Sequence, residues 1–161
     1  MRRIAPAMPQ PGSINPRIIE SLYCEALVLA DEVRATVALS GCRDAAPADD
    51  DLTRVAMSCE AVRTTTRMMH AIAWLLNQRA YSKGELSEFQ LRRHGGLAAD
   101  APAGDPERLA LLDPAMRELV QATERFYTRL QRLDRGWRER TPIVPGAIDR
   151  LRARLTAVPA D

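Results

Sequence analysis

The segment Arg63–Glu85 reads RTTTRMMHAIAWLLNQRAYSKGE, and it decides what kind of fold this chain adopts. Apolar and small side chains recur through it at intervals of three and four residues, the spacing that places them on one side of an α-helix. Gly84, near the end of the segment, supplies a stop for such a helix. The segment therefore predicts the C-terminal part of a long, buried helix.

The same spacing begins upstream of the segment and defines a predicted seam of a helical bundle. The seam consists of Leu52, Val55, Cys59, Val62, Thr66, Met69, Ala73, Leu76 and Ala80. Met68, Ile72 and Leu75 form a second apolar stripe beside it, so the helix has more apolar surface than one neighbour covers. We expect this helix to lie centrally in the bundle or at a dimer interface.

Two further long helices are indicated by their start signals. Asn15-Pro16 and Asp113-Pro114 each combine a capping side chain with a proline at the first helical position. Apolar residues then follow helical spacing over 18–37, up to a possible stop at Gly41, and again over 116–137. The connection 84–112 predicts a long mobile or binding loop with a short helix at 85–93.

The fold class that follows is all-α, with long helices in a three-helix antiparallel bundle over residues 14–140. Hydrophobic residues make up 46% of the 161 residues but aromatic residues only 4%, a palette that favours packed helices. We expect residues 1–13 to form a disordered N-terminal arm. Residues 141–161 are expected to form a flexible C-terminal tail, in which 147–158 can make a short amphipathic helix with Ile148, Leu151 and Leu155 on one side.

Signals for membrane spanning and for catalysis are missing from the sequence. No apolar stretch reaches membrane-spanning length, and the N-terminus has no signal-peptide pattern, so we expect a cytoplasmic protein. Three cysteines and two histidines show no zinc spacing, and no phosphate loop or nucleophile motif occurs. We therefore expect no metal, no cofactor and no enzymatic activity. Catalysis through His70 is a minor alternative to a packed boundary histidine.

Two binding hypotheses come from the residues alone. Arg67, Trp74, Gln78 and Tyr81 share one side of the predicted helix with His70, and Trp, Tyr and Arg often anchor protein interfaces. Packing under the third helix explains the same residues, so both interpretations remain open. From residue 116 onward ten arginines stand against six acidic residues, which keeps DNA binding as an alternative. The interleaved acids favour a solvated helix face instead.

Several motifs resemble those of the regulator of CtrA degradation (RcdA) family. They are LYCEALVLADEVR at 22–34, TTR at 65–67, AWLLNQRA at 73–80 and Gly-Glu at 84–85. The corresponding family pattern is Leu-Tyr-x-Glu-Ala, Leu-Ala-Asp-Glu, Thr-Thr-Arg and Ala-Trp-Leu-Leu-x-Gln-Arg-Ala. The resemblance covers both halves of the first predicted helical hairpin.

This resemblance implies an alphaproteobacterial cell-cycle protein with a three-helix bundle, commonly dimeric, and a flexible tail. Such proteins are adaptors of the ClpXP protease. The implied partners are ClpX with its priming response regulator, substrate proteins, and a second, cyclic-di-GMP-responsive adaptor that presents CtrA. A tethered substrate would meet the unfoldase at a raised effective concentration.

The matching positions supply candidate protein-binding residues. The candidates that match the family pattern are Glu25, Asp31, Arg34, Arg67, Trp74, Gln78 and Arg79. Tyr81 and the three apolar tail residues Ile148, Leu151 and Leu155 complete the set of candidates. Tyr23 also matches the pattern, and with Trp74 and Gln78 it is expected to hold the hairpin together at least in part. Glu25, Asp31 and Arg34 are expected to be exposed.

Overall fold

The computed structural model describes residues 13–41, 51–98 and 104–140, and these residues form helices and connections without any strand. The five helices of this part are α1 (Pro16–Gly41), α2 (Asp51–Ser82), α3 (Glu88–His94), α4 (Pro106–Leu111) and α5 (Pro114–Arg140). The all-α prediction is confirmed. The expectations for the N-terminal arm up to residue 12 and for the tail, including Ile148, Leu151 and Leu155, lie outside the described residues. None of the described helices has the length and apolar character needed to cross a membrane.

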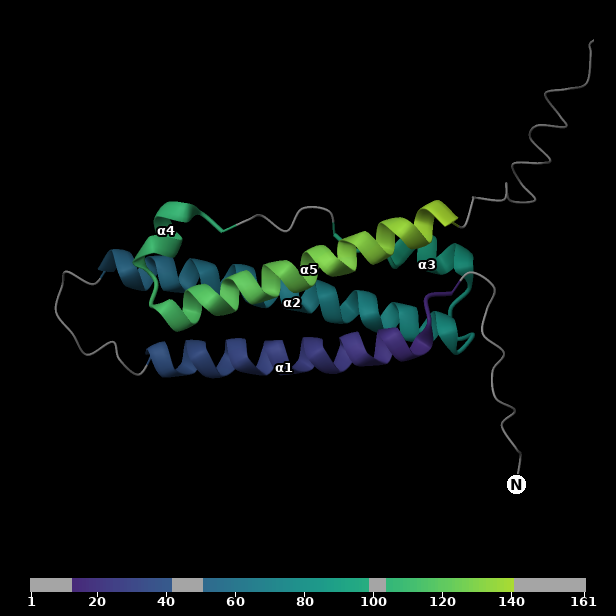
Figure 1. Ribbon diagram of the computed structural model, residues 1–161, viewed down its shortest axis with the longest axis horizontal. Helices are drawn as coiled ribbons and strands as arrows, with labels where there is room; N and C mark the ends of the chain where they lie inside the picture. The colour runs from purple at the N-terminus through teal and green to yellow at the C-terminus, as the bar shows by residue number, and fades with distance from the viewer. Residues whose placement is uncertain (1–12, 42–50, 99–103, 141–161) are drawn as a thin grey trace, which may run out of the picture.

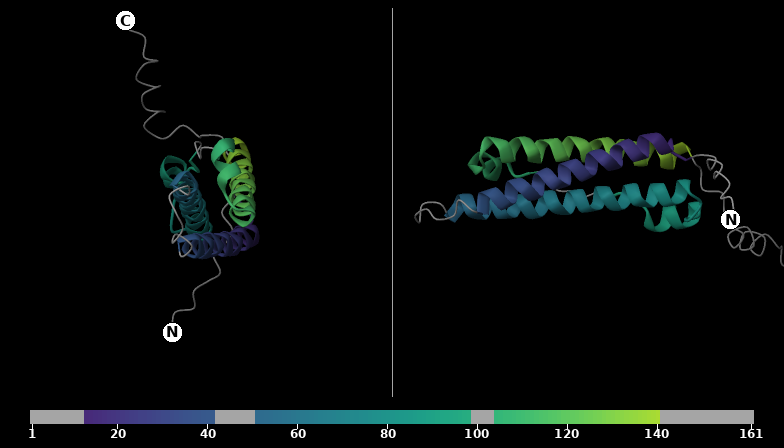
Figure 2. Two further views of the ribbon diagram at one scale, coloured as in Figure 1. Left: turned by 90° about the vertical axis from the view of Figure 1, so that its left-hand side faces the viewer. Right: turned by 90° about the horizontal axis from the view of Figure 1, so that it is seen from below.

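The three long helices lie side by side in one bundle (Figures 1 and 2). Cross-helix contacts give their directions: Glu20 of α1 pairs with Arg79 of α2, whereas Arg67 and Trp74 of α2 meet Glu124 and Asp134 of α5. α1 is therefore antiparallel to both other helices, while α2 and α5 run parallel. The chain returns from the end of α2 to the start of α5 along the bundle, by way of α3 and α4.

The helix boundaries follow the local sequence. The side chain of Asn15 accepts a hydrogen bond from the backbone N–H of Arg17 at 2.9 Å, and that of Asp113 accepts one from Met116 at 2.8 Å. α2 ends at Ser82, and the turn that follows passes through Gly84, whose φ of 76° lies in the left-handed region that glycine adopts without a Cβ clash. The backbone N–H of Glu85 closes this turn on the carbonyl of Ala80 at 2.9 Å.

The connection between α2 and α5 is more ordered than a mobile loop in the parts that the structure describes. Ser87 and Gln90 form a reciprocal capping box that starts α3, and Leu91 of this helix is only 1% exposed. The hydroxyl of Tyr127 donates to the carbonyl of Ala98 at 2.8 Å, which ties the returning chain to α5. The helix predicted near 85–93 is thus confirmed as α3, whereas α4 had not been predicted.

The predicted seam of α2 is wrong in its register. Five of its large apolar residues are exposed, and we call them the α2 stripe: Leu52 75%, Val55 58%, Val62 67%, Met69 64% and Leu76 44%. The side chains that α2 buries are offset from them, and seven of these form what we call the buried seam: Glu60, Thr64, Arg67, Ala71, Trp74, Gln78 and Tyr81. The second predicted stripe is largely confirmed, since Met68 and Leu75 are buried in the core.

The physical reason for this register lies in the two aromatic residues of α2. Trp74 and Tyr81 are 1% and 2% exposed, and Tyr81 meets Trp137 of α5 edge-to-face with ring centroids 6.1 Å apart. Large aromatic side chains bury more area than valine or leucine. The free energy gained by burying Trp74 and Tyr81 against α5 therefore exceeds the cost of leaving the aliphatic stripe in water. On α1 and α5 most of the predicted apolar positions do face the core.

Candidate protein-binding site

The first feature of the site is an apolar groove between α1 and α2 with a volume of about 440 Å³. Ala30, Val33 and Val37 of α1 and Met68, Met69 and Ile72 of α2 are among its lining residues. Val33 and Met68 form its buried floor, whereas Met69 stands exposed at the rim. Aliphatic walls and flexible methionines suit an apolar ligand surface that can adapt in shape.

The α2 stripe adjoins this groove, because Met69 belongs to both. Its members recur at intervals of three or seven residues, so they lie along one side of α2 from Leu52 to Leu76. Exposed apolar residues scattered singly are ordinary on a protein surface. A stripe that continues into an apolar groove is instead typical of an interaction surface.

A second feature is the polar contact between α2 and α5, which holds the candidate residues Arg67 and Trp74. Arg67 is 3% exposed and donates to Thr123 Oγ1 at 3.0 Å and to Glu124 at 3.2 Å. Burial lowers the pKa of Arg67 from its ordinary value, against the opposing attraction of Glu124 and Glu60. Trp74 donates through Nε1 to Asp134 at 2.9 Å. These contacts fix the parallel packing of α2 and α5.

Four of the predicted binding residues therefore lie inside the bundle. Arg67, Trp74, Gln78 and Tyr81 are each at most 3% exposed, so a partner cannot reach them while α5 covers α2. Of the two interpretations that the sequence left open, the geometry supports packing under the third long helix. These four side chains shape the scaffold on which the exposed face of α1 and α2 is displayed.

Of the remaining described candidates, Glu25, Asp31 and Arg34 are exposed, as expected, and Arg79 is half-buried. Asp31 and Arg34 form an exposed ion pair at 2.7 Å, and Arg34 also lines the groove. Glu25 pairs with Arg129 of α5. Arg79 lies 3.0 Å from Glu20, and its guanidinium stands 4.6 Å from the ring centroid of Tyr23, so this cluster does hold the α1–α2 hairpin together.

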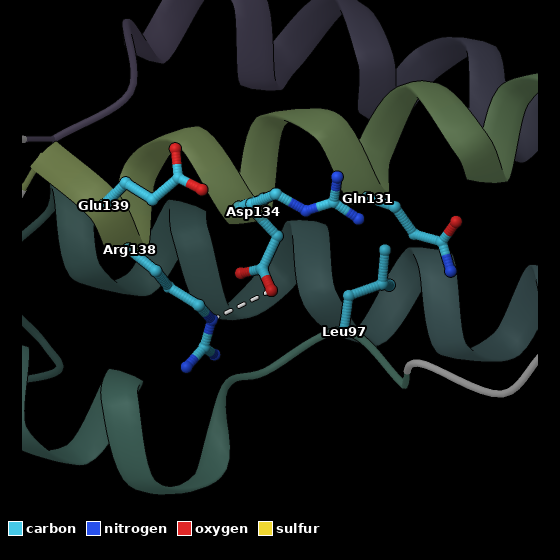
Figure 3. Close-up of a pocket in the computed structure, with 6 residues that line it drawn as sticks. Leu97, Gln131, Asp134, Arg138 and Glu139 are labelled. Carbon is cyan, nitrogen blue, oxygen red and sulfur yellow. Dashed lines mark hydrogen bonds and ion pairs between the residues drawn. The ribbon is translucent and has the colours of Figure 1, made fainter.

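A polar pocket of about 580 Å³ lies between α5 and the chain that follows α3. Its lining includes Leu97, Gln131 and Asp134, and Figure 3 shows Asp134 and Arg138 pointing toward each other. Arg138 donates to Asp134 at 2.9 Å, so the carboxylate is already engaged from two sides. His70 is exposed, lines neither this pocket nor the groove, and does not share the buried side of Trp74. In the described part of the chain no group of His, Cys, Asp and Glu is placed to hold a metal ion.

Comparison with known proteins places this architecture in a family. The family model described as "Protein of unknown function (DUF1465)" matches residues 11–158. The chain belongs to the DUF1465 family. The match runs from before α1 to beyond the end of α5, so it includes most of the tail segment that follows Arg140. No curated protein and no solved structure matched the chain.

The groove residues are the part of this site that sequence reasoning missed. Val37 and Ile72 lie on predicted apolar faces, where they were expected to pack inside the bundle. Their partial exposure depends on how α1 and α2 are rotated about their axes. That rotation is set by packing against helices that are distant in sequence. The one feature of the sequence that indicated an exposed apolar surface was that α2 has more apolar residues than one neighbouring helix covers.

Proposed function

We propose that this DUF1465 protein is a non-enzymatic adaptor, which binds protein substrates in the cytoplasm and delivers them to the ClpXP protease in regulated cell-cycle proteolysis. The observation that carries the proposal is the apolar face formed by the groove and the α2 stripe. It lies on α1 and α2, the two helices that bear the motifs resembling the RcdA family.

The proposal assigns different roles to the motif residues according to their exposure. Asp31 and Arg34 are placed to touch a partner, since they are exposed and Arg34 borders the groove. Trp74 and Gln78 act indirectly, by setting how α2 packs. The expected partners, by resemblance, are ClpX with its priming response regulator, substrate proteins and a second adaptor. Delivery then works through the raised local concentration of a tethered substrate.

We also propose a homodimer, which the α2 stripe supports. Leu52, Val55 and Val62 lie outside the groove and recur at intervals of three and seven residues, which fit the heptad repeat of coiled-coil seams. Val62→Asp would place a charge in this interface, so we expect it to give monomers in sedimentation experiments. Phe89→Asp on α3 replaces an equally exposed apolar residue, 69% against 67%, and should leave the dimer intact. Dimers that survive Val62→Asp would contradict this interface.

Affinity capture from the native lysate tests the adaptor function. The full chain, its Met69→Asp variant, the Phe89→Asp control and a 1–140 truncation serve as baits, with mass spectrometry as the readout. We expect ClpX, a response-regulator-like primer or transcription factors to be enriched by the full chain and by the control. Capture should fall with Met69→Asp and with the truncation. Loss of the same partners with Phe89→Asp would contradict a site on α1 and α2.

DNA binding remains a second candidate because of one observation on α5. Arg125, Arg132 and Arg135 are exposed, and their spacing places them on one side of the helix. A DNA-binding regulator should bind duplex DNA with an affinity that falls steeply with salt. A mobility-shift assay at low salt measures this, and absence of any shift removes the candidate. Recovery of only DNA-associated proteins from the lysate, lost on nuclease treatment, would favour it over the adaptor.

A further inference from the structure

The α1–α2 groove is an apolar surface that no described side chain fills, although its floor residues Val33 and Met68 are buried. We propose that residues 147–158 of the same chain bind in this groove as a short amphipathic helix. The proposal concerns the occupant of the groove in the free protein. It does not rest on the adaptor function, although a partner that binds the same groove would displace the segment.

The position at which the described chain ends makes this segment available. α5 ends at Arg140, at the end of the bundle where α1 begins and α2 finishes (Figure 1). Residues 141–147 can span up to about 24 Å when extended. Met69 lies twelve residues before Tyr81 on α2, or about 18 Å along the helix axis, and Tyr81 contacts Trp137 near the end of α5. A twelve-residue helix running back along α2 covers the same distance.

The pattern of the segment matches an apolar groove between two helices. Ile148, Leu151 and Leu155 follow the spacing i, i+3 and i+7, which places them on one side of a helix. The groove offers aliphatic and methionine walls for such a side. A helix this short is marginal in water, so burial of its apolar side against another surface is what would stabilise it.

Charged residues flank both apolar surfaces. The segment carries Arg150, Arg152 and Arg154 against a single acid, Asp149. On α1, Glu20 and Asp31 are exposed and, by helical spacing, lie on the same side as the groove residue Arg34. Asp31 already pairs with Arg34 and Glu20 with Arg79, so the placement rests on apolar contact and not on charge. The family match, which extends to residue 158, includes the segment in the sequence that DUF1465 proteins share.

Hydrogen exchange measured by mass spectrometry on the full chain tests the proposal. We expect the amides of 147–158 to exchange at least tenfold more slowly in the wild type than in a Leu151→Asp variant. Met69→Asp, at the rim of the groove, should give the same loss of protection. Met69 is already 64% exposed, so this change does not disturb the core. Phe89→Asp on α3 is the matched control and should leave the protection unchanged.

Three outcomes would overturn the proposal. The first is rapid exchange of 147–158 in the wild type. The second is an equal effect of Met69→Asp and Phe89→Asp. The third is protection that disappears on dilution together with dimers, which would mean that a second copy supplies the occupant. Each result is obtained without ClpX, so failure here is distinguishable from failure of the adaptor proposal.

Discussion

At the scale of single residues, two buried threonines on facing helices illustrate how the α2–α5 contact is stabilised. Thr64 and Thr123 are both 0% exposed. The hydroxyl of Thr123 donates to the carbonyl of Val120 and accepts from Arg67, whereas the hydroxyl of Thr64 has no hydrogen-bond partner. A buried polar atom without a partner costs free energy, while one that serves a buried charge contributes to stability.

The same substitution should therefore have opposite effects at the two positions. We expect Thr64→Val to raise the free energy of unfolding by about 1 kcal/mol, since valine keeps the shape and removes the unpartnered hydroxyl. Thr123→Val should lower it by about 1.5–3 kcal/mol, because the buried Arg67 guanidinium loses an acceptor. Urea unfolding measures both changes. Destabilisation by Thr64→Val would show that this hydroxyl is satisfied in the folded protein.

Two buried tyrosines make the stability depend on alkaline pH. Burial raises the pKa of Tyr127 and also that of Tyr81, where Glu88 adds to the effect. The folded state thus keeps these phenolic protons at a pH where the unfolded state loses them. The two tyrosines make their full contribution to the free energy of unfolding below the unfolded pKa of about 10. That contribution is lost as pH rises through their higher pKa values in the folded state.

We therefore expect the free energy of unfolding to fall as pH is raised from 8 to 11, with a smaller fall for Tyr127→Phe. The variant also lacks the hydrogen bond to Ala98, so the comparison concerns the slope with pH and not the absolute stability. Urea titrations at each pH provide the slopes. Equal slopes for the variant and the wild type would contradict a raised pKa for Tyr127.

At the scale of the helices, two glycines give an internal comparison of where each helix tolerates a side chain. Gly84 ends α2 with a φ of 76°, a conformation that L-residues rarely adopt. Gly136 lies inside α5, and a Cβ added there would meet nothing within 4 Å. The first glycine is required by the turn, whereas the second only weakens its helix.

We expect Gly84→Ala to destabilise the protein by about 1 kcal/mol and Gly136→Ala to stabilise it by about 0.5–1 kcal/mol. Thermal unfolding followed by circular dichroism measures both variants against the wild type. A Gly84→Ala protein as stable as the wild type would mean that α2 can end in another way. Gly136→Ala serves as the control that alanine is favourable within a regular helix.

The elements also show how far local sequence determines this fold. Asn15 and Asp113 cap their helices as their position before proline predicts, and Gly84 ends α2. α4 was missed because it has six residues and buries none of them, so periodicity carries no signal there. The register predicted for α2 was wrong because two sets of positions on the helix share the same spacing. Spacing alone does not show which of the two sets is buried.

At the scale of the whole molecule, the two core clusters that the described residues form lie within residues 14–137. We therefore expect a 1–140 truncation to keep its helical circular dichroism spectrum and a cooperative thermal transition, while it captures fewer partners than the full chain. Loss of the cooperative transition would show that the segment after Arg140 is part of the structural core. A stable truncation that captures every partner would instead show that the tail does not take part in binding.

The sequence by itself determined the all-α class, three long helices and most of their ends, because caps, glycine stops and apolar periodicity act within a few residues. Only the tertiary structure decided that α2 and α5 run parallel and that α2 turns Arg67, Trp74 and Tyr81 inward. The α2 stripe and the groove are consequences of that rotation. It depends on the area that Trp74 and Tyr81 bury against α5 and on the partners that Thr123, Glu124 and Asp134 supply, all more than fifty residues away in sequence.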